Sequence, residues 1–138
     1  MREPDFIIGG LDAPYLLRWY IIPRNKVFNI YLHQFLRSDD DRALHDHPWM
    51  NVSFLLWGQY LEHLPNSQIV HRVAGDFAFR RATALHRIEL IENQPCWTLF
   101  LTGPTTREWG FQCSWGWRHW KEFTDGEHGE TVGQGCDN

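Results

Sequence analysis

A succession of short apolar and aromatic runs, separated by turn residues, most limits what this chain can fold into. The first two runs, residues 15–22 and 27–36, flank the sequence Pro-Arg-Asn-Lys, which predicts a β-hairpin. Similar runs, such as WMNVSFLLW, CWTLFLTG and GWRHWKEF, continue to residue 123. Many short strands joined by Gly, Pro and Asn turns predict an all-β fold, either a sandwich or a closed barrel.

The segment RRATALHRIELIE, residues 80–92, does not follow this pattern clearly. Its residues favour a helix by intrinsic propensity. Alternate residues such as His86, Ile88 and Leu90 would also share one face of a strand. Periodicity does not decide so short a run, so the residues alone leave helix and strand open.

The length of 138 residues predicts a single domain. We expect residues 1–123 to form the barrel with its N-terminal hairpin. Residues 124–138 are rich in Gly and acidic residues, and we expect them to form a flexible tail with His128 solvated. A domain of this size buries roughly two-thirds of its unfolded surface, so a bound metal would serve function rather than rescue stability.

The composition argues against several classes of partner and site. A net charge of -4 and a pI near 6.0 provide no basic surface for nucleic acid. The sequence has neither an apolar run of about 18 residues nor a signal peptide, so we expect no membrane partner and a cytoplasmic location. Cys96, Cys113 and Cys136 are widely spaced and odd in number, which argues against a disulfide framework and a thiolate zinc site.

Two histidines placed two residues apart, His45 and His47, are the first candidates for chemistry. Residues i and i+2 of a strand point the same way, so both imidazoles would project from one face. They could bind Zn, Cu, Fe or Ni if another strand supplied a third ligand. An HxH pair also arises by chance, and the residues alone leave six candidates for the third ligand: His33, His63, His71, His86, His119 and His128.

The spacing around this pair resembles the first motif of the cupin superfamily. That motif is HxH, three or four residues, Glu, six residues and Gly. Here His45 and His47 are followed after three residues by Asn51, and after six more by Gly58. The resemblance therefore holds at every position except the glutamate, which Asn51 replaces.

A second run resembles the other cupin motif, which is Gly, five residues, Pro-x-Gly, two residues and His. Gly75 and His86 occupy the outer positions, while Arg81 and Thr83 replace the Pro and the second Gly. The chain is also similar, in runs such as LRSDDDRALHDHPW, LFLTGP and REWGF, to a group of small cupin-like proteins that are uncharacterised and come from bacteria and phages.

The resemblance implies a double-stranded β-helix, or jelly roll, in which His45, His47 and His86 meet at one metal ion. It also makes residues 80–92 a turn followed by a strand. Without the motif glutamate, three neutral ligands would leave the site with a charge of +2, which favours an anionic substrate or hydroxide. Some cupins without that acid hold iron with three histidines, thiol dioxygenases among them, and others have lost metal altogether.

Other polar residues are candidates for the walls of such a cavity. Glu62 would act as an acid or base, or else be a solvent-facing edge carboxylate. Arg107 would pair with a substrate anion, or else lie at the surface beside a packed tryptophan. The candidates for catalysis are Asn51, Tyr60 and Glu62, and those for substrate binding are His33, Arg107 and Trp109.

Three hypotheses for function follow. The first is a mononuclear three-histidine non-haem oxygenase that uses Fe(II) and O₂ on a small molecule. The second is a metal-dependent isomerase, epimerase or lyase, with Fe(II), Zn, Ni or Mn as the divalent ion. The third is a non-catalytic cupin that binds a small ligand or a metal. We expect a small-molecule substrate, anionic by the charge argument, and the resemblance suggests a homodimer.

Overall fold

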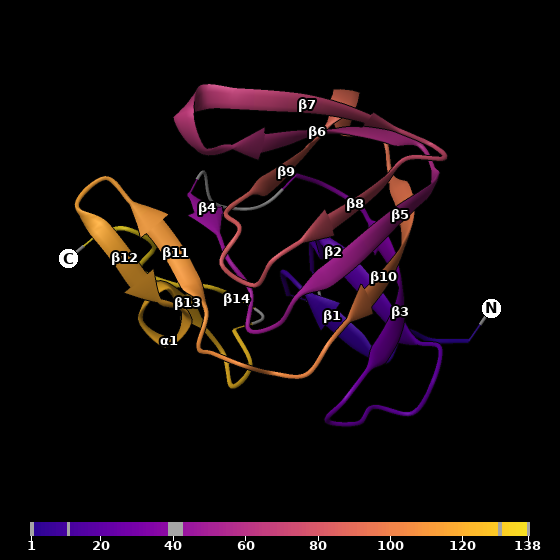
Figure 1. Cartoon of the computed structure of the whole chain (residues 1–138), viewed down its shortest axis with the longest axis horizontal. Coiled ribbons are helices and arrows are strands. Elements are labelled where there is room, and N and C mark those ends of the chain that lie inside the picture. Colours follow the sequence, from indigo (N-terminus) through magenta and orange to yellow (C-terminus); the bar gives the residue numbers. More distant parts are fainter. Residues whose placement is uncertain (1, 11, 39–42, 130, 138) are drawn as a thin grey trace.

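Antiparallel β-strands form the body of the chain, described by a computed structural model for residues 2–10, 12–38, 43–129 and 131–137 (Figure 1). The acidic run of residues 39–41 lies outside the described residues. The largest sheet has six strands, in the order β1 (Phe6–Ile8), β2 (Leu16–Tyr20), β3 (Asn29–Phe35), β10 (Cys96–Thr102), β5 (Asn51–Trp57) and β8 (Phe77–Arg80).

Two smaller sheets and a short C-terminal unit complete the fold. One sheet contains β7 (Gln68–Val73), β6 (Gln59–Leu64) and β9 (Arg87–Leu90), and the other contains β12 (Gly116–His119), β11 (Gly110–Cys113) and β4 (Leu44–His45). The remaining elements are the 3-10 turns η1 (Pro65–Ser67) and η2 (Ile91–Asn93), the helical turn α1 (Trp120–Phe123), and the strand pair β13 (Thr124–Asp125) and β14 (Thr131–Val132). The all-β prediction is confirmed, although the last predicted strand ends in α1.

The six-stranded sheet has one buried and one apolar outer face. In β3 and β10 every second residue is buried, as expected for strands with one face toward a core. The predicted hairpin is present, since β2 and β3 pair from Leu16–Phe35 to Tyr20–Tyr31. The buried face carries polar as well as apolar residues, and this polar part becomes the wall of a cavity.

The ambiguous segment 80–92 forms a turn, then strand β9, then the 3-10 turn η2. Strand β9 pairs with β6 from Tyr60–Leu90 to His63–Arg87. Pairing across the sheet thus outweighs the helix propensity of these residues. The turn and strand implied by the cupin resemblance are confirmed, and the helical alternative is wrong.

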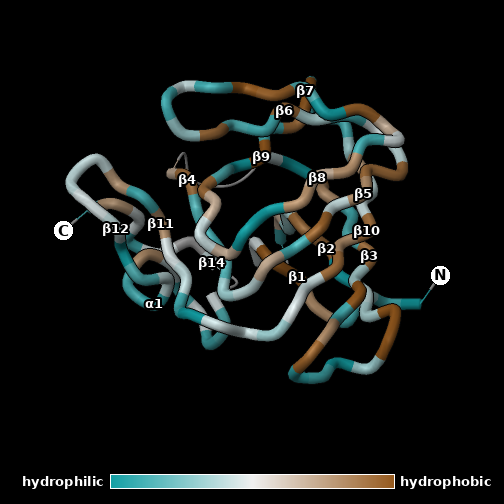
Figure 2. Tube along the Cα trace, in the orientation of Figure 1, coloured by the Kyte–Doolittle hydropathy of each residue, from teal (hydrophilic) through white to brown (hydrophobic). Residues whose placement is uncertain are grey.

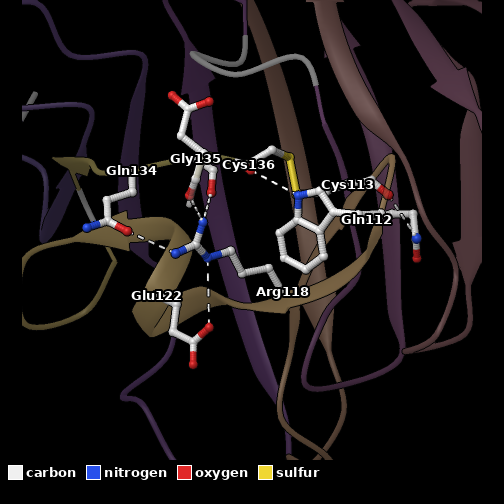
Figure 3. The surroundings of a disulfide bond; sticks show 9 residues. Gln112, Cys113, Arg118, Glu122, Gln134, Gly135 and Cys136 are labelled. Carbon is white, nitrogen blue, oxygen red and sulfur yellow. Dashed lines mark hydrogen bonds and ion pairs between the residues drawn. A yellow bond between two sulfur atoms is a disulfide. The ribbon is translucent and has the colours of Figure 1, made fainter.

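A disulfide joins Cys113 on β11 to Cys136 near the C-terminus (Figure 3). The argument from cysteine spacing against a disulfide framework did not anticipate this bond, because the fold brings together two residues 23 positions apart. Arg118 on β12 also holds this segment, because it donates to the carbonyl of Gly135 (Figure 3). It also donates to the carbonyl of Asp137. The predicted domain boundary at residue 123 and the flexibility of the tail stay predictions.

The outer face of the six-stranded sheet exposes large apolar side chains, and the tube is brown along much of β5 and β10 (Figure 2). Phe54 on β5 stacks on Phe77 of β8, with ring centroids 5.6 Å apart. Within the described chain, no helix has the length and apolar character needed to cross a bilayer.

Candidate metal centre

Two paired segments of the chain bring the three predicted metal ligands together. The backbones of His45 and His86 form an antiparallel bridge, with N–O distances of 2.9 and 3.0 Å in the two directions. The amide of His47 donates to the carbonyl of Ala82 at 3.0 Å. Residues 45–47 therefore run antiparallel to residues 82–86, which places both histidines of the HxH pair beside His86.

The three imidazoles form a nearly equilateral cluster. The ring centroids lie 4.8 Å apart for His45 and His86, 5.0 Å for His47 and His86, and 5.1 Å for His45 and His47. One ring nitrogen of each residue lies within 4.8 Å of those of the other two. The predicted convergence of these residues is confirmed, and the cluster could hold one metal ion.

The environment keeps all three rings neutral. Burial lowers the pKa of His45 and of His86 to about 4. Burial, with the neighbouring rings His86 and His45, holds the pKa of His47 well below its usual value. Neutral imidazole is the form that binds metals, so the lone pairs are available at neutral pH.

Glu62 on β6 fixes the orientation of His86 from behind. Its carboxylate is 1% exposed and accepts from His86 Nδ1 at 2.7 Å, from Arg80 Nε at 2.7 Å and from Arg72 Nε at 3.0 Å. Burial alone would raise the pKa of Glu62, but the hydrogen bonds from His86 and Arg80 outweigh it and hold the pKa well below its usual range. An ionised carboxylate only accepts, so His86 Nδ1 carries the proton and Nε2 keeps its lone pair.

Two observations on the three imidazoles indicate that they suit a divalent ion. His86 presents a fixed neutral tautomer, as a ligating histidine normally does when its other nitrogen donates to a carboxylate. His47 Nδ1 is buried and has no hydrogen-bond partner among the described residues. These three histidines are thus the residues that would hold the ion.

The predicted catalytic residues take different places. Tyr60 lines the cavity beside the triad, and burial raises the pKa of its phenol, which stays protonated. Asn51 is buried beside Arg80, which donates to its Oδ1 at 3.2 Å. Glu62 is buried, so the solvent-facing alternative is wrong, and both Glu62 and Asn51 lie outside the set of described residues that line the cavity.

The triad opens on a cavity of about 560 Å³ that the three predicted substrate-binding residues also line. Arg107 pairs with Asp46 at 3.0 Å and donates to the His47 carbonyl at 3.1 Å. Trp109 lies with its ring 6.5 Å from that of His45. His33 is buried on the inner face of β3, which makes it a wall of the cavity rather than a solvent-facing residue.

Asp46 forms its hydrogen bonds with groups outside the triad and does not accept from the ring of a proposed metal ligand. It accepts from the amide of Gly110 at 2.7 Å and from Trp117 Nε1 at 3.0 Å. With Arg107, these contacts hold the HxH segment against β11 and β12.

Arg18 and Arg80 were missed by the sequence analysis. Arg18 lines the cavity, and Arg80 fills the buried space behind it. A signal was available, since each lies within an apolar strand and shares a face with apolar residues, Leu16 for Arg18 and Ala78 for Arg80. A charged residue at an inward position of a strand indicates a paired or functional group.

Comparison with known proteins supports the fold. No protein-family model and no curated protein sequence matches the chain. A cupin superfamily protein from Desulfitobacterium hafniense superposes with a TM-score of 0.54 at 16% identity, over 64% of this chain and 77% of that protein. An uncharacterised Klebsiella pneumoniae protein with a double-stranded β-helix domain gives 0.59 at 15% identity, over 80% and 95%.

A third similar structure is the DMSP lyase DddQ from Ruegeria pomeroyi, with a TM-score of 0.56 and 16% identity, over 75% of this chain and 54% of the lyase. At these identities the likeness concerns the fold alone. The chain has the double-stranded β-helix fold of cupin superfamily proteins, as the motif spacing predicted. Membership of the bacterial and phage group stays a prediction.

Proposed function

We propose that this protein is a metal-dependent enzyme that binds one divalent ion through His45, His47 and His86 and converts a small molecule in the adjoining cavity. One observation carries the proposal: three neutral, clustered imidazoles lie on the wall of a cavity of about 560 Å³. We favour Fe(II) and an oxygenase, because the ligand set resembles that of cupins that hold iron with three histidines. When bound, such an ion supplies O₂ activation if it is iron, or Lewis acidity if it is Zn, Ni or Mn.

The protein's own groups would position the substrate and manage protons. The aromatic rings of Phe100 and Trp109 line the cavity, 6.3 Å from the ring of His47 and 6.5 Å from that of His45, and would contact an apolar part of the substrate. Tyr60 offers a protonated phenol that can donate a hydrogen bond or a proton to the substrate. Glu62 keeps the Nδ1 proton of His86 in place throughout.

A lyase or isomerase without redox chemistry is the second candidate. Two observations favour it: a similar solved structure is a DMSP lyase, and the cavity contains a protonated tyrosine able to serve as a general acid. A non-catalytic cupin that binds a small ligand or a metal is the third candidate.

The first experiment is elemental analysis of protein purified without added metal, with His86→Ala compared to His71→Ala. His71 is exposed and contacts Gln59, so its loss should leave metal content unchanged, whereas His86→Ala should lose most of the metal. A His86→Ala variant with full metal content would eliminate the proposed ligand set.

A second experiment separates the reactions. The Fe(II) form is supplied with a panel of small thiols, phenols and acids while O₂ consumption is measured, and the Zn form is assayed without O₂. Substrate-dependent O₂ uptake supports the oxygenase. Turnover by the Zn form without O₂ supports the lyase or isomerase. Metal binding without turnover in either form supports the non-catalytic alternative.

A further inference from the structure

A positively charged side chain on the cavity wall, on strand β2, forms no ion pair with any acidic residue that the structure describes. Arg18 faces His33 of β3 in the strand register and donates from Nε to His33 Nε2 at 2.9 Å. His33 Nε2 must therefore be the acceptor, and its ring proton lies on Nδ1. Burial and the charge of Arg18 hold the pKa of His33 well below its usual value, so this ring is neutral and cannot balance a negative charge.

The guanidinium of Arg18 has unused donors. Its centre lies 4.4 Å from the ring of Tyr31, and its two terminal NH₂ groups have no hydrogen-bond partner among the described residues. The other arginines of the barrel interior differ, since Arg80 pairs with Glu62 and Arg107 pairs with Asp46. An arginine presents five donors in a planar fork, and Arg18 uses one of them within the described part of the chain.

The surroundings add positive rather than negative charge. Arg24 also lines the cavity, stacks 5.7 Å from the ring of Tyr20, and forms no ion pair with any described residue. The rings near Arg18 belong to tyrosines and to Phe6. A half-buried cation without a counter-ion is unfavourable, and a bound anion would offset that cost.

One aromatic ring, that of Phe100, separates the Arg18–His33 pair from the histidine triad. The ring of Phe100 is 5.0 Å from that of His33 and 6.3 Å from that of His47. Arg18, His33, Phe100 and His47 all line the same cavity. A small molecule lying along Phe100 would thus reach the guanidinium at one end and the histidines at the other.

We propose that Arg18, positioned by His33, binds the oxyanion end of a small organic acid whose other end faces the histidine triad. The fork of an arginine matches the two oxygens of a carboxylate or phosphate and forms paired charge-assisted hydrogen bonds with them. The second part of this assignment rests on the proposed function, whereas anion binding by Arg18 does not. The geometry also moves the anion-binding role from Arg107, whose charge is already paired with Asp46 through Nη1, to Arg18.

Binding of three probes of similar shape tests this site: benzoate, phenyl phosphate and neutral benzamide. Titrations use EDTA-treated protein, so that no metal can bind the anion, and are followed by calorimetry. One of the two anions should bind at least about tenfold more tightly than benzamide, as expected for charge-assisted hydrogen bonds, and its affinity should fall with added salt. The tighter anion identifies the carboxylate or the phosphate as the preferred group.

Variants assign the binding to one residue. Arg18→Met should weaken anion binding by about tenfold or more and leave benzamide binding unchanged. Arg18→Lys keeps the charge without the fork, so it should show an intermediate loss, and it serves if the Met variant does not fold. Arg81→Met is the matched control, because Arg81 is exposed and lies outside the described lining of the cavity.

Equal affinities for benzoate, phenyl phosphate and benzamide, or anion binding that survives both Arg18 variants, would overturn the proposal. So would anion binding that requires added Zn and persists without Arg18, because the anion would then be at the metal. Metal content is measured in parallel. An Arg18 variant that loses anion binding but keeps its metal content assigns the anion site to Arg18. A native protein that binds the anion but no metal refutes only the proposed function.

Discussion

At the scale of single residues, Glu62 is a buried carboxylate that carries a negative charge inside the barrel. Its two oxygens satisfy Arg72, Arg80 and His86, so the carboxylate is both compensated and essential to its neighbours. Removing one partner of such a buried cluster leaves the others uncompensated, which costs more than the cluster contributes as a whole. Glu62 is therefore best regarded as a positioning residue, and its predicted catalytic role stays a prediction.

Glu62→Gln should weaken metal binding roughly 10- to 100-fold, because a neutral amide replaces the charged acceptor of His86 and orients its ring less firmly. Competition with a chromophoric chelator measures the change. Glu89→Gln on neighbouring β9 is the control, since Glu89 contacts His63 rather than a triad member and its side chain is 45% exposed. Equal affinity in the Glu62 and Glu89 variants would contradict the positioning role.

Acid should destabilise the metal-free protein in a defined range. Burial lowers the pKa of His33, His45, His47 and His86 in the folded state, while unfolded histidine titrates near pH 6.5. Between about pH 6.5 and pH 4 the unfolded chain binds more protons than the folded one, so the free energy of unfolding decreases as pH falls, by on the order of 1 kcal/mol per pH unit for each histidine.

Urea denaturation in EDTA at pH 7.5, 6 and 5 measures this dependence. His33→Asn should flatten it, because one of the depressed groups is removed. A stability that stays constant or rises toward pH 5 would contradict the assignment of neutral, buried rings.

At the scale of elements, Gly58 is the single residue between β5 and β6, where the chain bends from the six-stranded sheet into the sheet of β6, β7 and β9. Its φ is +94°, a conformation that other residues rarely adopt. A Cβ at this position would lie 2.7 Å from the Cβ of Cys96 at the start of β10. The outer glycine of the first cupin motif is thus required by both backbone conformation and packing.

Gly58→Ala should therefore destabilise the protein by roughly 2 kcal/mol or more, from the positive φ and the clash together. Gly75→Ala separates the two causes, because Gly75 has φ +99° with no atom within 4 Å of an added Cβ, and should cost roughly 1 kcal/mol. Urea denaturation compares them. Equal losses would remove the packing argument.

At the scale of the whole molecule, the C-terminal segment ties the β11–β12 sheet to the cavity. His128, Gly129 and Thr131 line the cavity. The chain after Thr131 is anchored to β11 by the disulfide between Cys136 and Cys113. The ring of His128 is exposed and lies 6.2 Å from that of Phe6. Disulfides are rare in reducing compartments, so this bond favours an oxidising compartment, whereas the predicted cytoplasmic location is a reducing one. The location stays a prediction.

Reduction, or Cys136→Ser, should lower stability by about 3 kcal/mol if chain entropy sets the effect of closing this loop. Thermal unfolding with and without dithiothreitol measures it. Cys96→Ser is the control, since this buried cysteine is free and burial raises the pKa of its thiol to about 12. Dithiothreitol should leave the melting temperature of Cys136→Ser unchanged; a further decrease would show that another bond is involved.

The apolar outer face of the six-stranded sheet is where we expect the predicted homodimer to form. Phe54 and Leu56 of β5 and Phe77 and Phe79 of β8 are all at least 40% exposed on this face. Contiguous exposed apolar residues of this kind mark interaction surfaces. Phe79→Lys should convert a dimer to a monomer in light scattering, whereas Ile69→Lys on β7 should not. A monomeric native protein would refute the expectation.

Residue order predicts most of the strands, and the resemblance to the cupin motifs predicts the histidine triad. Alternation with a period of two is a local property, so β2, β3 and β10 could be predicted from residue order. The HxH spacing placed two imidazoles on one face, and the motif spacing identified His86 among six candidates. These features depend on the number of residues between positions, which can be read from the sequence.

Which charged groups and thiols pair with one another depends on the packed fold. Three partnerships depend on the register between strands far apart in sequence. Glu62 lies behind His86, Asp46 pairs with Arg107, and Arg18 has no counter-ion among the described residues. The disulfide between Cys113 and Cys136 depends on the same kind of placement. Interactions between charges and between thiols act through space, and only the packed barrel sets those distances.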